Sequence, residues 1–401
     1  MPPPGGAISM LLQLMNLFTK YVLSASLLLA GYGGRAQFIL QDENALGLLK
    51  VRYQRGDTGV VRQVQSLIST ARGILTGDTF AVTFRKTKLA PSNDPHDYMS
   101  MAPYWWPDSS KPGGVPYIRR DGHINPERYL LHDNSQLVAM AAQVKQLGAA
   151  YYFSEDEQYA QRAAKLLQTW FIDTATRMNP HLDYGQYIPG INNGRGIGII
   201  ETAGLLAIPD ALAMMQKSPA MKPALVKGLK QWYGAYLQWL LTSKNGREEQ
   251  KEKNNHGTFY DLQVCDYAVF TGQDSIARRE IRETSIPRMA VQFSPDGRQP
   301  LELARTKSWS YSLFNLTAWT KLALLAQRQH IDLWAQQTAG GQGLEKCIRF
   351  LLPYAGKEQG WAYEQIEPFG QEGLRYIIFM AAPHYSNWPA PETGNLELLL
   401  Y

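Results

Sequence analysis

Apolar residues recur three and four positions apart over most of this chain, and that spacing predicts amphipathic helices. The first such run extends from Val51 to Leu75 and ends before Gly77. Further helices are predicted at about 133–150, 154–176, 199–215, 219–243, 257–271, 274–292, 308–328, 330–338, 343–356 and 388–400. Few segments alternate apolar and polar residues as strands do, so the chain is predicted to be mostly helical.

Two long segments between the predicted helices lack this spacing. Residues 79–131 contain seven prolines, and residues 179–198 carry several tyrosine and asparagine side chains. A connection as long as the first one is usually functional or disordered in a compact domain. Its aromatic residues, among them Tyr98, Trp105 and Trp106, argue against disorder, so we expect an ordered and functional loop.

The arrangement of these elements predicts an all-α fold. About ten helices joined by short turns are typical of consecutive helical hairpins. We expect an (α/α) toroid, an incomplete barrel of helical hairpins in which long aromatic loops lie over a central cleft. An open α-solenoid is the alternative, although no strict period separates the hairpins as it does in repeat proteins.

The N-terminal segment differs from the rest of the chain. Lys20 precedes the apolar run Tyr21–Ala30, and a stretch of small residues ends at Ala36. This pattern predicts a secretory signal peptide over residues 1–36. The apolar run is shorter than the roughly 20 residues that span a membrane. We therefore expect a periplasmic or secreted protein with no membrane span and with one domain over residues 37–401.

The composition narrows the classes of function. Of the 401 residues, 45% are hydrophobic and 19% are charged, which is typical of a globular protein with a sizeable core. The net charge of +5 is dispersed and forms no basic stripe, so we expect no nucleic-acid partner. Neither Cys265 nor Cys347 has a His or Cys neighbour at metal-ligand spacing, so we assign them no chemistry. The mature chain also contains no H-E-x-x-H, C-x-x-C, G-x-G-x-x-G or P-loop motif, and we expect no metal and no cofactor.

A first candidate for chemistry is the run Asn254–Tyr260, which follows the charged residues Arg247–Glu252 and opens an apolar helix. The amide of Asn255 and the imidazole of His256 suit the removal of a proton next to a carboxylate, because a helix start favours negative charge. Asparagine is also a common helix cap, and a lone histidine is often a structural residue. Both interpretations stay open at this point.

A second candidate is the segment from Glu302 to Tyr311, just before another predicted helix. The guanidinium of Arg305 can bind a carboxylate with two hydrogen bonds. If Arg305 and His256 lie near Tyr311, the pKa of its phenol should fall from about 10, and the tyrosinate could act as a base. In the alternative interpretation Arg305 pairs with Glu302, and Tyr311 belongs to the core.

These segments together resemble a known family. The run Pro95–Asp108, followed by Asp121–Glu127, is similar to the alginate lyase domain of helical-toroid polysaccharide lyases. Asn254–Tyr260 resembles the Asn-Asn-His motif of that family, and Glu302–Arg305 with Tyr311 resembles its Arg and Tyr segment. The three regions occur in the order that the family has.

The resemblance implies an (α/α) toroid that cleaves a uronate polysaccharide by β-elimination without a metal. Asn255 matches the amide that neutralises the carboxylate of the substrate, with help from His256 and Arg305. Tyr311 matches the phenol that takes the C5 proton and returns a proton to the leaving O4. His256 could be the base instead if the proton lies on the opposite face of the sugar.

We expect alginate, and polymannuronate in particular, as the anionic polysaccharide substrate. One phenol that serves as both base and acid suits a sugar whose proton and leaving oxygen share a face. Polyglucuronate or a mixed uronate polymer is the near alternative, while a helical-toroid glycoside hydrolase with two carboxylates and a glycan-binding protein are the other classes. The oligomeric state stays open. The candidate substrate-binding residues are His96, Tyr98, Trp105, Trp106, Tyr184, Tyr187, Asn193, Arg195, Asn254 and Tyr260.

Overall fold

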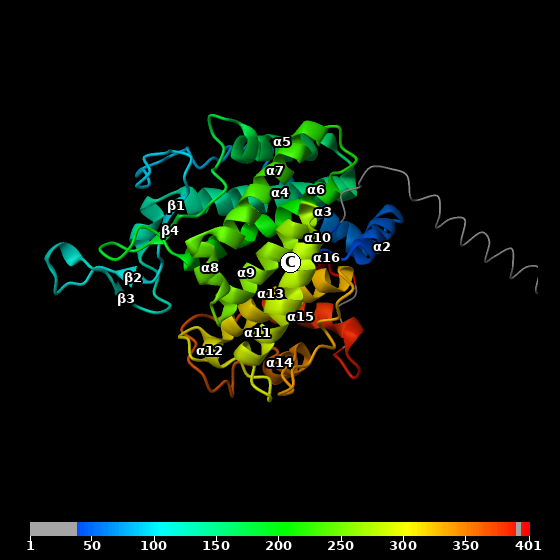
Figure 1. The fold of residues 1–401 in the computed structure, drawn as a ribbon. Coiled ribbons are helices and arrows are strands. Elements are labelled where there is room, and N and C mark those ends of the chain that lie inside the picture. The colour runs from blue at the N-terminus through cyan, green and yellow to red at the C-terminus, as the bar shows by residue number, and fades with distance from the viewer. Residues whose placement is uncertain (1–37, 390–393) are drawn as a thin grey trace, which may run out of the picture. The chain divides into compact units, whose positions relative to one another are not determined.

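The computed structural model describes residues 38–389 and 394–401 (Figure 1). The predicted signal peptide, residues 1–36, lies outside the described residues. Residues Phe38–Tyr401 form one compact unit.

Most of the described residues are helical, as the spacing of apolar residues predicted. The α-helices are α2 (Glu43–Gln54), α3 (Thr58–Arg72), α4 (Asp133–Ser154), α5 (Glu157–Leu167), α6 (Ala207–Met214), α7 (Pro223–Thr242), α8 (Lys244–Gln250), α9 (Asn255–Phe270), α10 (Asp274–Glu280), α11 (Ile286–Gln292), α12 (Pro300–Leu303), α13 (Ser308–Arg328), α14 (Leu344–Leu351), α15 (Glu372–Ala381) and α16 (Leu396–Leu399). Short 3-10 helices are η1 (Pro112–Gly114), η2 (Pro126–Leu130), η4 (Gly196–Leu206), η6 (Leu352–Tyr354) and η7 (Ala382–His384), and two π-helical turns are η3 (Gln168–Ile172) and η5 (Ile281–Ser285).

The order in which the helices pack closes a ring. Helix α4 packs against α6, α9 packs against η4 and α13, and α13 packs against α15. Helix α16 then joins α15 to α2 and α3, and α3 packs back against α4. This neighbour order is that of a toroid of helical hairpins, and in Figure 1 the long helices α9 and α13 lie side by side within it.

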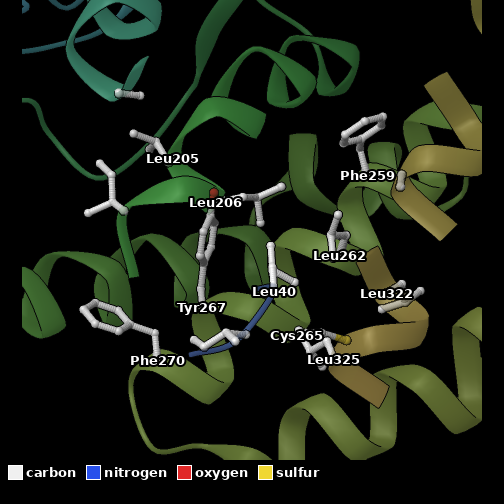
Figure 2. Close-up of a cluster of buried hydrophobic side chains, with 14 of the residues drawn as sticks. Leu40, Leu205, Leu206, Phe259, Leu262, Cys265, Tyr267, Phe270, Leu322 and Leu325 are labelled. Carbon is white, nitrogen blue, oxygen red and sulfur yellow. The ribbon is translucent and has the colours of Figure 1, made fainter. Parts of the chain in front are cut away.

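Helix α9 is the most deeply buried long helix of the ring, and its position explains its sequence. Buried residues occur on all its sides, so it has no solvent-facing stripe. Figure 2 shows Leu262, Cys265 and Tyr267 of α9 among the leucines of neighbouring elements. Both cysteines of the chain are free and buried, as two thiols in separate helices.

The two irregular segments fold into short strands that support each other. Strand β1 (Met99–Met101) pairs in parallel with β4 (Tyr184–Tyr187), so the first long loop is bonded to the second. Strand β2 (Trp105–Trp106) pairs antiparallel with β3 (Ile118–Arg119) and forms a small hairpin. The aromatic loop is thus ordered, as its rings predicted.

Several element boundaries differ from the prediction. The first predicted helix is two helices, because Gly56 has a φ of +78° and Asp57 caps α3 through hydrogen bonds from Gly59 and Val60. The predicted helix at 330–338 is an irregular segment instead. Its apolar residues Leu333 and Trp334 are buried, which gave the sequence a helix-like pattern. No helix was predicted from the sequence at the position of α15.

The charged run before α9 is a helix rather than a solvated loop. Ser243 caps α8 by accepting a hydrogen bond from the backbone N–H of Gly246, at 2.9 Å. Gly246 and Glu249 lie three positions apart on the buried side of α8, and Glu248 points to solvent. Charge alone therefore did not predict which residues of this run are exposed.

One helical stretch is apolar enough to be tested as a membrane span. Residues Gly196–Met214, which combine η4 and α6, meet the criteria of length and hydropathy within the described part of the chain. About 67% of this stretch is buried inside the protein, as expected for a core helix of the toroid.

Candidate active site

The first turn of α9 presents the asparagine and histidine of the first candidate motif. The side-chain oxygen of Asn254 accepts a hydrogen bond from the backbone N–H of His256 at 3.0 Å and thereby caps the helix. The cap fixes Asn255 and His256 at the positive end of the helix dipole. Asn254 therefore has a structural role as the cap of α9, and its predicted contact with the substrate stays a prediction.

A buried carboxylate holds Asn255 in place. The backbone N–H of Asn255 donates to Glu302 at 2.7 Å, and its side-chain amide donates to the second oxygen of Glu302 at 2.8 Å. Burial raises the pKa of Glu302, and the hydrogen bonds from Asn255 oppose that rise. Glu302 is thus the partner of Asn255, and the ion pair of Arg305 is with Asp121 instead of the alternative partner Glu302.

His256 has an acidic partner of its own. Its Nδ1 lies 2.8 Å from a carboxylate oxygen of Glu249, which comes from α8 and is only 1% exposed. Burial raises the pKa of Glu249, and the neighbouring imidazole opposes that rise. The carboxylate therefore orients the ring through Nδ1, and Nε2 is the ring nitrogen that takes no part in this contact.

The phenol of Tyr311, on the first turn of α13, lies between two other side chains. Its hydroxyl is 2.7 Å from the hydroxyl of Tyr104 and accepts a hydrogen bond from Arg305 at 2.9 Å. The Arg305 guanidinium also covers the ring of Tyr311, 3.9 Å from its centroid. Tyr311, Tyr104 and Arg305 thus form one connected group.

The charge of Arg305 is shared with Asp121 from the aromatic loop. Two nitrogens of Arg305 donate to the carboxylate of Asp121, at distances of 2.8 to 3.1 Å. Burial raises the pKa of Asp121, but the hydrogen bond and charge of Arg305 outweigh it and lower this pKa to about 2. In this geometry Arg305 anchors the loop and contacts the phenol, in addition to the substrate contact that the sequence predicted.

The predicted fall in the pKa of Tyr311 is wrong for this site. Burial raises this pKa well above its usual value, and the nearby Tyr104 hydroxyl raises it further. The guanidinium of Arg305 lowers it, but by less than burial raises it. Tyr311 is therefore a protonated phenol at neutral pH.

Stacked rings show that the two helix starts face each other. Phe259 of α9 and Phe314 of α13 stack with their centroids 4.2 Å apart. Phe259 lies three residues after His256, and Phe314 lies three residues after Tyr311, so each pair shares one side of its helix. His256 and Tyr311 consequently lie on facing sides of α9 and α13, one turn beyond the stacked rings.

Rings and cations alternate on the two loops beside this group. The guanidinium of Arg195 lies over the ring of Trp105 at 6.0 Å, and the ammonium of Lys88 lies over that of Tyr187 at 4.5 Å. Trp106 donates from its indole nitrogen to the backbone oxygen of His123 at 2.9 Å. Partly exposed rings beside cations are suited to an acidic sugar polymer.

The remaining predicted residues of the second loop are less closely bound to this group. Tyr184 is half-buried in β4, and Asn193 is exposed. Arg195 donates to the side chain of Gln186 at 2.8 Å, and burial lowers the pKa of its guanidinium.

Three predicted substrate-binding residues lie elsewhere. Tyr98 is 0% exposed and donates to Glu201, and Tyr260 is 1% exposed and donates to the backbone oxygen of Leu240. Their phenols are buried in the protein, so the prediction of sugar contacts is wrong for both. The ring of His96 binds the backbone oxygen of Arg177 at 2.6 Å.

Sequence reasoning missed three functional neighbours of the predicted residues, namely Glu249, Tyr104 and Asp121. Glu249 could have been found from the helical spacing after the Ser243 cap. The other two lie in the aromatic loop, far from Tyr311 in sequence, and no local pattern pairs them with it. Within residues 38–389 and 394–401, no three His, Cys, Asp or Glu side chains form a group that could hold a metal ion.

Comparison with known proteins places this geometry in a family. The family model described as alginate lyase matches residues 82–361. An alginate lyase from Bacteroides ovatus has 38% sequence identity and a TM-score of 0.83, and the alignment covers 91% of this chain and 99% of that one. No curated protein sequence matches the chain significantly.

More distant structures share the fold alone. Alginate lyase A1-III from Sphingomonas species A1 has 17% identity and a TM-score of 0.53, with coverage of 92% of this chain and 99% of that chain. A variant of that enzyme complexed with a tetrasaccharide has 15% identity and a TM-score of 0.52, with coverage of 83% and 93%. The predicted helical toroid and the predicted family are both confirmed. The chain belongs to the alginate lyase family and is a polysaccharide lyase built on a helical toroid.

Proposed function

We propose that this lyase cleaves alginate, with polymannuronate as its preferred block, by β-elimination that leaves an unsaturated uronate end. The observation that carries the proposal is the placement of Tyr311 opposite the start of α9, where Asn255 and His256 lie. An acid–base phenol and a set of hydrogen-bond donors thus lie on the first turns of two helices that pack against each other.

Charge stabilisation comes from the start of α9 in this proposal. Loss of the C5 proton converts the carboxylate of the uronate into a dianion-like group, which hydrogen-bond donors and a helix N-terminus stabilise. Asn255 and His256 supply the donors, and Glu302 keeps the amide oriented. One donor of this kind contributes about 2.7–4 kcal/mol to transition-state stabilisation in well-studied oxyanion holes.

Tyr311 transfers the protons. Its raised pKa supports the donor step, because a protonated phenol can protonate O4 as the bond between C4 and O4 breaks. For the base step, the Arg305 nitrogen at 2.9 Å stabilises the tyrosinate that takes the C5 proton. One phenol can do both only if proton and leaving oxygen share a face, as they do in mannuronate.

The raised pKa of Tyr311 favours a second assignment of the catalytic base. His256 would then take the C5 proton through Nε2, since its Nδ1 is bonded to Glu249, and Tyr311 would act only as the acid. The two groups approach from facing helices, so this version suits guluronate, the C5 epimer. The preference between the two blocks therefore discriminates between the assignments.

The test uses purified protein and offers polymannuronate, polyguluronate and polyglucuronate in the presence of a chelator. Elimination creates a conjugated double bond, so ultraviolet absorbance should rise on polymannuronate. Tyr311→Phe should lower this rate roughly 100- to 10,000-fold, the range for loss of a general acid–base group. Tyr53→Phe, which alters a partly exposed phenol of α2 that packs edge-on against Phe153, is the matched control and should keep full activity.

Two results would contradict the proposal. A Tyr311→Phe enzyme with near-normal turnover would remove the phenol from the mechanism. Release of saturated reducing ends without absorbance would indicate hydrolysis.

We further propose export to the periplasm or beyond, on the sequence of residues 1–36 alone. The exported protein should then begin at Gln37 when its N-terminus is analysed by mass spectrometry.

A further inference from the structure

Glu249 is an unusual member of an otherwise charged and accessible helix. Its neighbour Glu248 has a side chain that is 48% exposed and pairs with Lys244, whereas Glu249 is 1% exposed. Close backbone contacts fix α8 there. A Cβ on Gly246 would lie 1.8 Å from the backbone oxygen of Leu240, and one on Gly196 would lie 2.6 Å from that of Asn245. The position of the Glu249 carboxylate is therefore set by packing on two sides.

The contact between Glu249 and His256 defines which ring nitrogen carries a proton. An ionised carboxylate only accepts hydrogen bonds, so while Glu249 is ionised the Nδ1 that lies 2.8 Å from it is the donor and bears the hydrogen. The neutral ring then has its lone pair on Nε2. This nitrogen is the one available to a substrate.

The contact with His256 is the main interaction that compensates the buried charge of Glu249. One carboxylate oxygen bonds His256, and the other, Oε2, has no hydrogen-bond partner among the described residues. Among residues 38–389 and 394–401, Glu249 forms its ion pair with His256 and none with an arginine or lysine. The titratable groups that act on this carboxylate from the elements around it are His256, Glu252, Arg195, Arg288, Tyr236 and Tyr260. A buried charge with one such partner binds it strongly, because separation would leave the charge uncompensated.

We propose that Glu249 is a positioning residue of the lyase site, which holds the Nδ1–H of His256 and thereby presents Nε2 to the substrate. The inference rests on the proposed function only in that His256 contacts the substrate. Glu249 also stabilises the imidazolium whenever Nε2 holds a proton, either as a donor to the uronate carboxylate or after taking the C5 proton. It acts through His256 and does not touch the sugar.

The kinetic test compares Glu249→Gln with Glu248→Gln, a matched change at the next position of the same helix. The glutamine can still accept from Nδ1 through its oxygen, but it can also present its amide and has no charge. We expect kcat to fall roughly ten- to a hundredfold, as for other groups that orient a functional histidine, with KM changed less than about threefold. Glu248→Gln should match the wild type.

The pH profile separates positioning from a purely structural role. In Glu249→Gln the limb of the kcat profile that belongs to the Glu249–His256 pair should move, because one of its two charges is gone. Equal thermal unfolding of both variants shows that the loss is not one of folding. A Glu249→Gln enzyme with wild-type kcat and an unmoved pH profile would overturn the proposal.

A spectroscopic test does not depend on turnover. Nitrogen-15 spectra distinguish the two tautomers of histidine, and the signal of His256 is the one lost from the set of 7 histidines in His256→Ala. The wild type should show a proton on Nδ1, and Glu249→Gln should show a mixture of tautomers. A wild-type His256 with its only proton on Nε2 would overturn the proposal, even if the protein folds only with Glu249 intact. If no uronate polymer is cleaved, the proposed function fails, and these spectra still decide the role of Glu249.

Discussion

Replacement of Tyr104 by phenylalanine tests the connected group around Tyr311. Tyr104→Phe keeps the ring that the Lys307 ammonium approaches at 5.7 Å and removes only the hydroxyl, which lies 2.7 Å from that of Tyr311. The change therefore leaves the packing of the aromatic loop intact. It alters one hydrogen bond at the proposed acid–base group.

The magnitude follows from the type of bond that is lost. A neutral hydrogen bond contributes about 0.5–1.5 kcal/mol. If Tyr104 holds the phenol in its reactive position, the same amount is lost in the transition state, so kcat should fall roughly 2- to 12-fold. A far larger loss would mean that Tyr104 itself transfers a proton.

The pH dependence has a predicted sign. The Tyr104 hydroxyl raises the pKa of Tyr311, so its removal should lower that pKa. In the proposed elimination on polymannuronate the tyrosinate takes the C5 proton, so the limb of the kcat profile on which the rate rises as the phenol loses its proton should move to lower pH. The assay is the rise in ultraviolet absorbance, measured across pH.

A control variant on the same loop tests whether the loss of any hydroxyl there lowers activity by disturbing the loop. Tyr117→Phe removes a hydroxyl that donates to Glu127 at 2.7 Å, within the aromatic loop, and should change neither kcat nor the position of that limb. The reasoning is refuted if Tyr104→Phe leaves both unchanged, or if Tyr117→Phe has the same effect as Tyr104→Phe.

Two further predictions concern stability. The carboxylate of Asp121 has a folded pKa of about 2 against an ordinary 3.8, so its ion pair with Arg305 should stabilise the fold above about pH 4 and lose this effect as pH falls towards 2. Because the site is partly exposed to solvent, Asp121→Asn should cost only roughly 1 kcal/mol at pH 7, measured as a shift in urea midpoint that vanishes near pH 2. Gly257→Ala should destabilise by about 1–3 kcal/mol in the same assay, because a Cβ there would lie 2.1 Å from Arg288 and 2.2 Å from the backbone oxygen of Glu252. An alanine variant as stable as the wild type would show that Arg288 moves aside freely.

The starts of α9 and α13 could be predicted from sequence because local chemistry marks them. Asn254 is a helix cap, and the apolar spacing of α13 begins at Ser308, as predicted. Since Asn255, His256 and Tyr311 occupy those first turns, their common position followed once the helices were paired.

The faces of these helices could not be predicted in the same way. Helix α9 is buried on all sides, so its sequence carries no apolar stripe that would show where Tyr260 points. The pKa of Tyr311 depends on its burial and on the hydroxyl of Tyr104 from a distant loop, which no local pattern reveals. Glu249 was hidden for the opposite reason, because acidic and basic neighbours on both sides made its surroundings resemble solvent-exposed sequence.

The pairing of β1 with β4 makes the two long loops a single mechanical unit. The hydroxyl of Ser100 accepts a hydrogen bond from the backbone of Gln186 at 2.8 Å, and the N–H of Ala102 donates to the backbone oxygen of Tyr187 at 3.1 Å. If only one of the two loops were replaced by that of a related lyase, its strand would not match the hydrogen-bonding groups of the strand that remains. Changes of substrate preference by loop exchange should therefore succeed only when both loops come from the same parent, and single-loop chimaeras should show strongly non-additive losses.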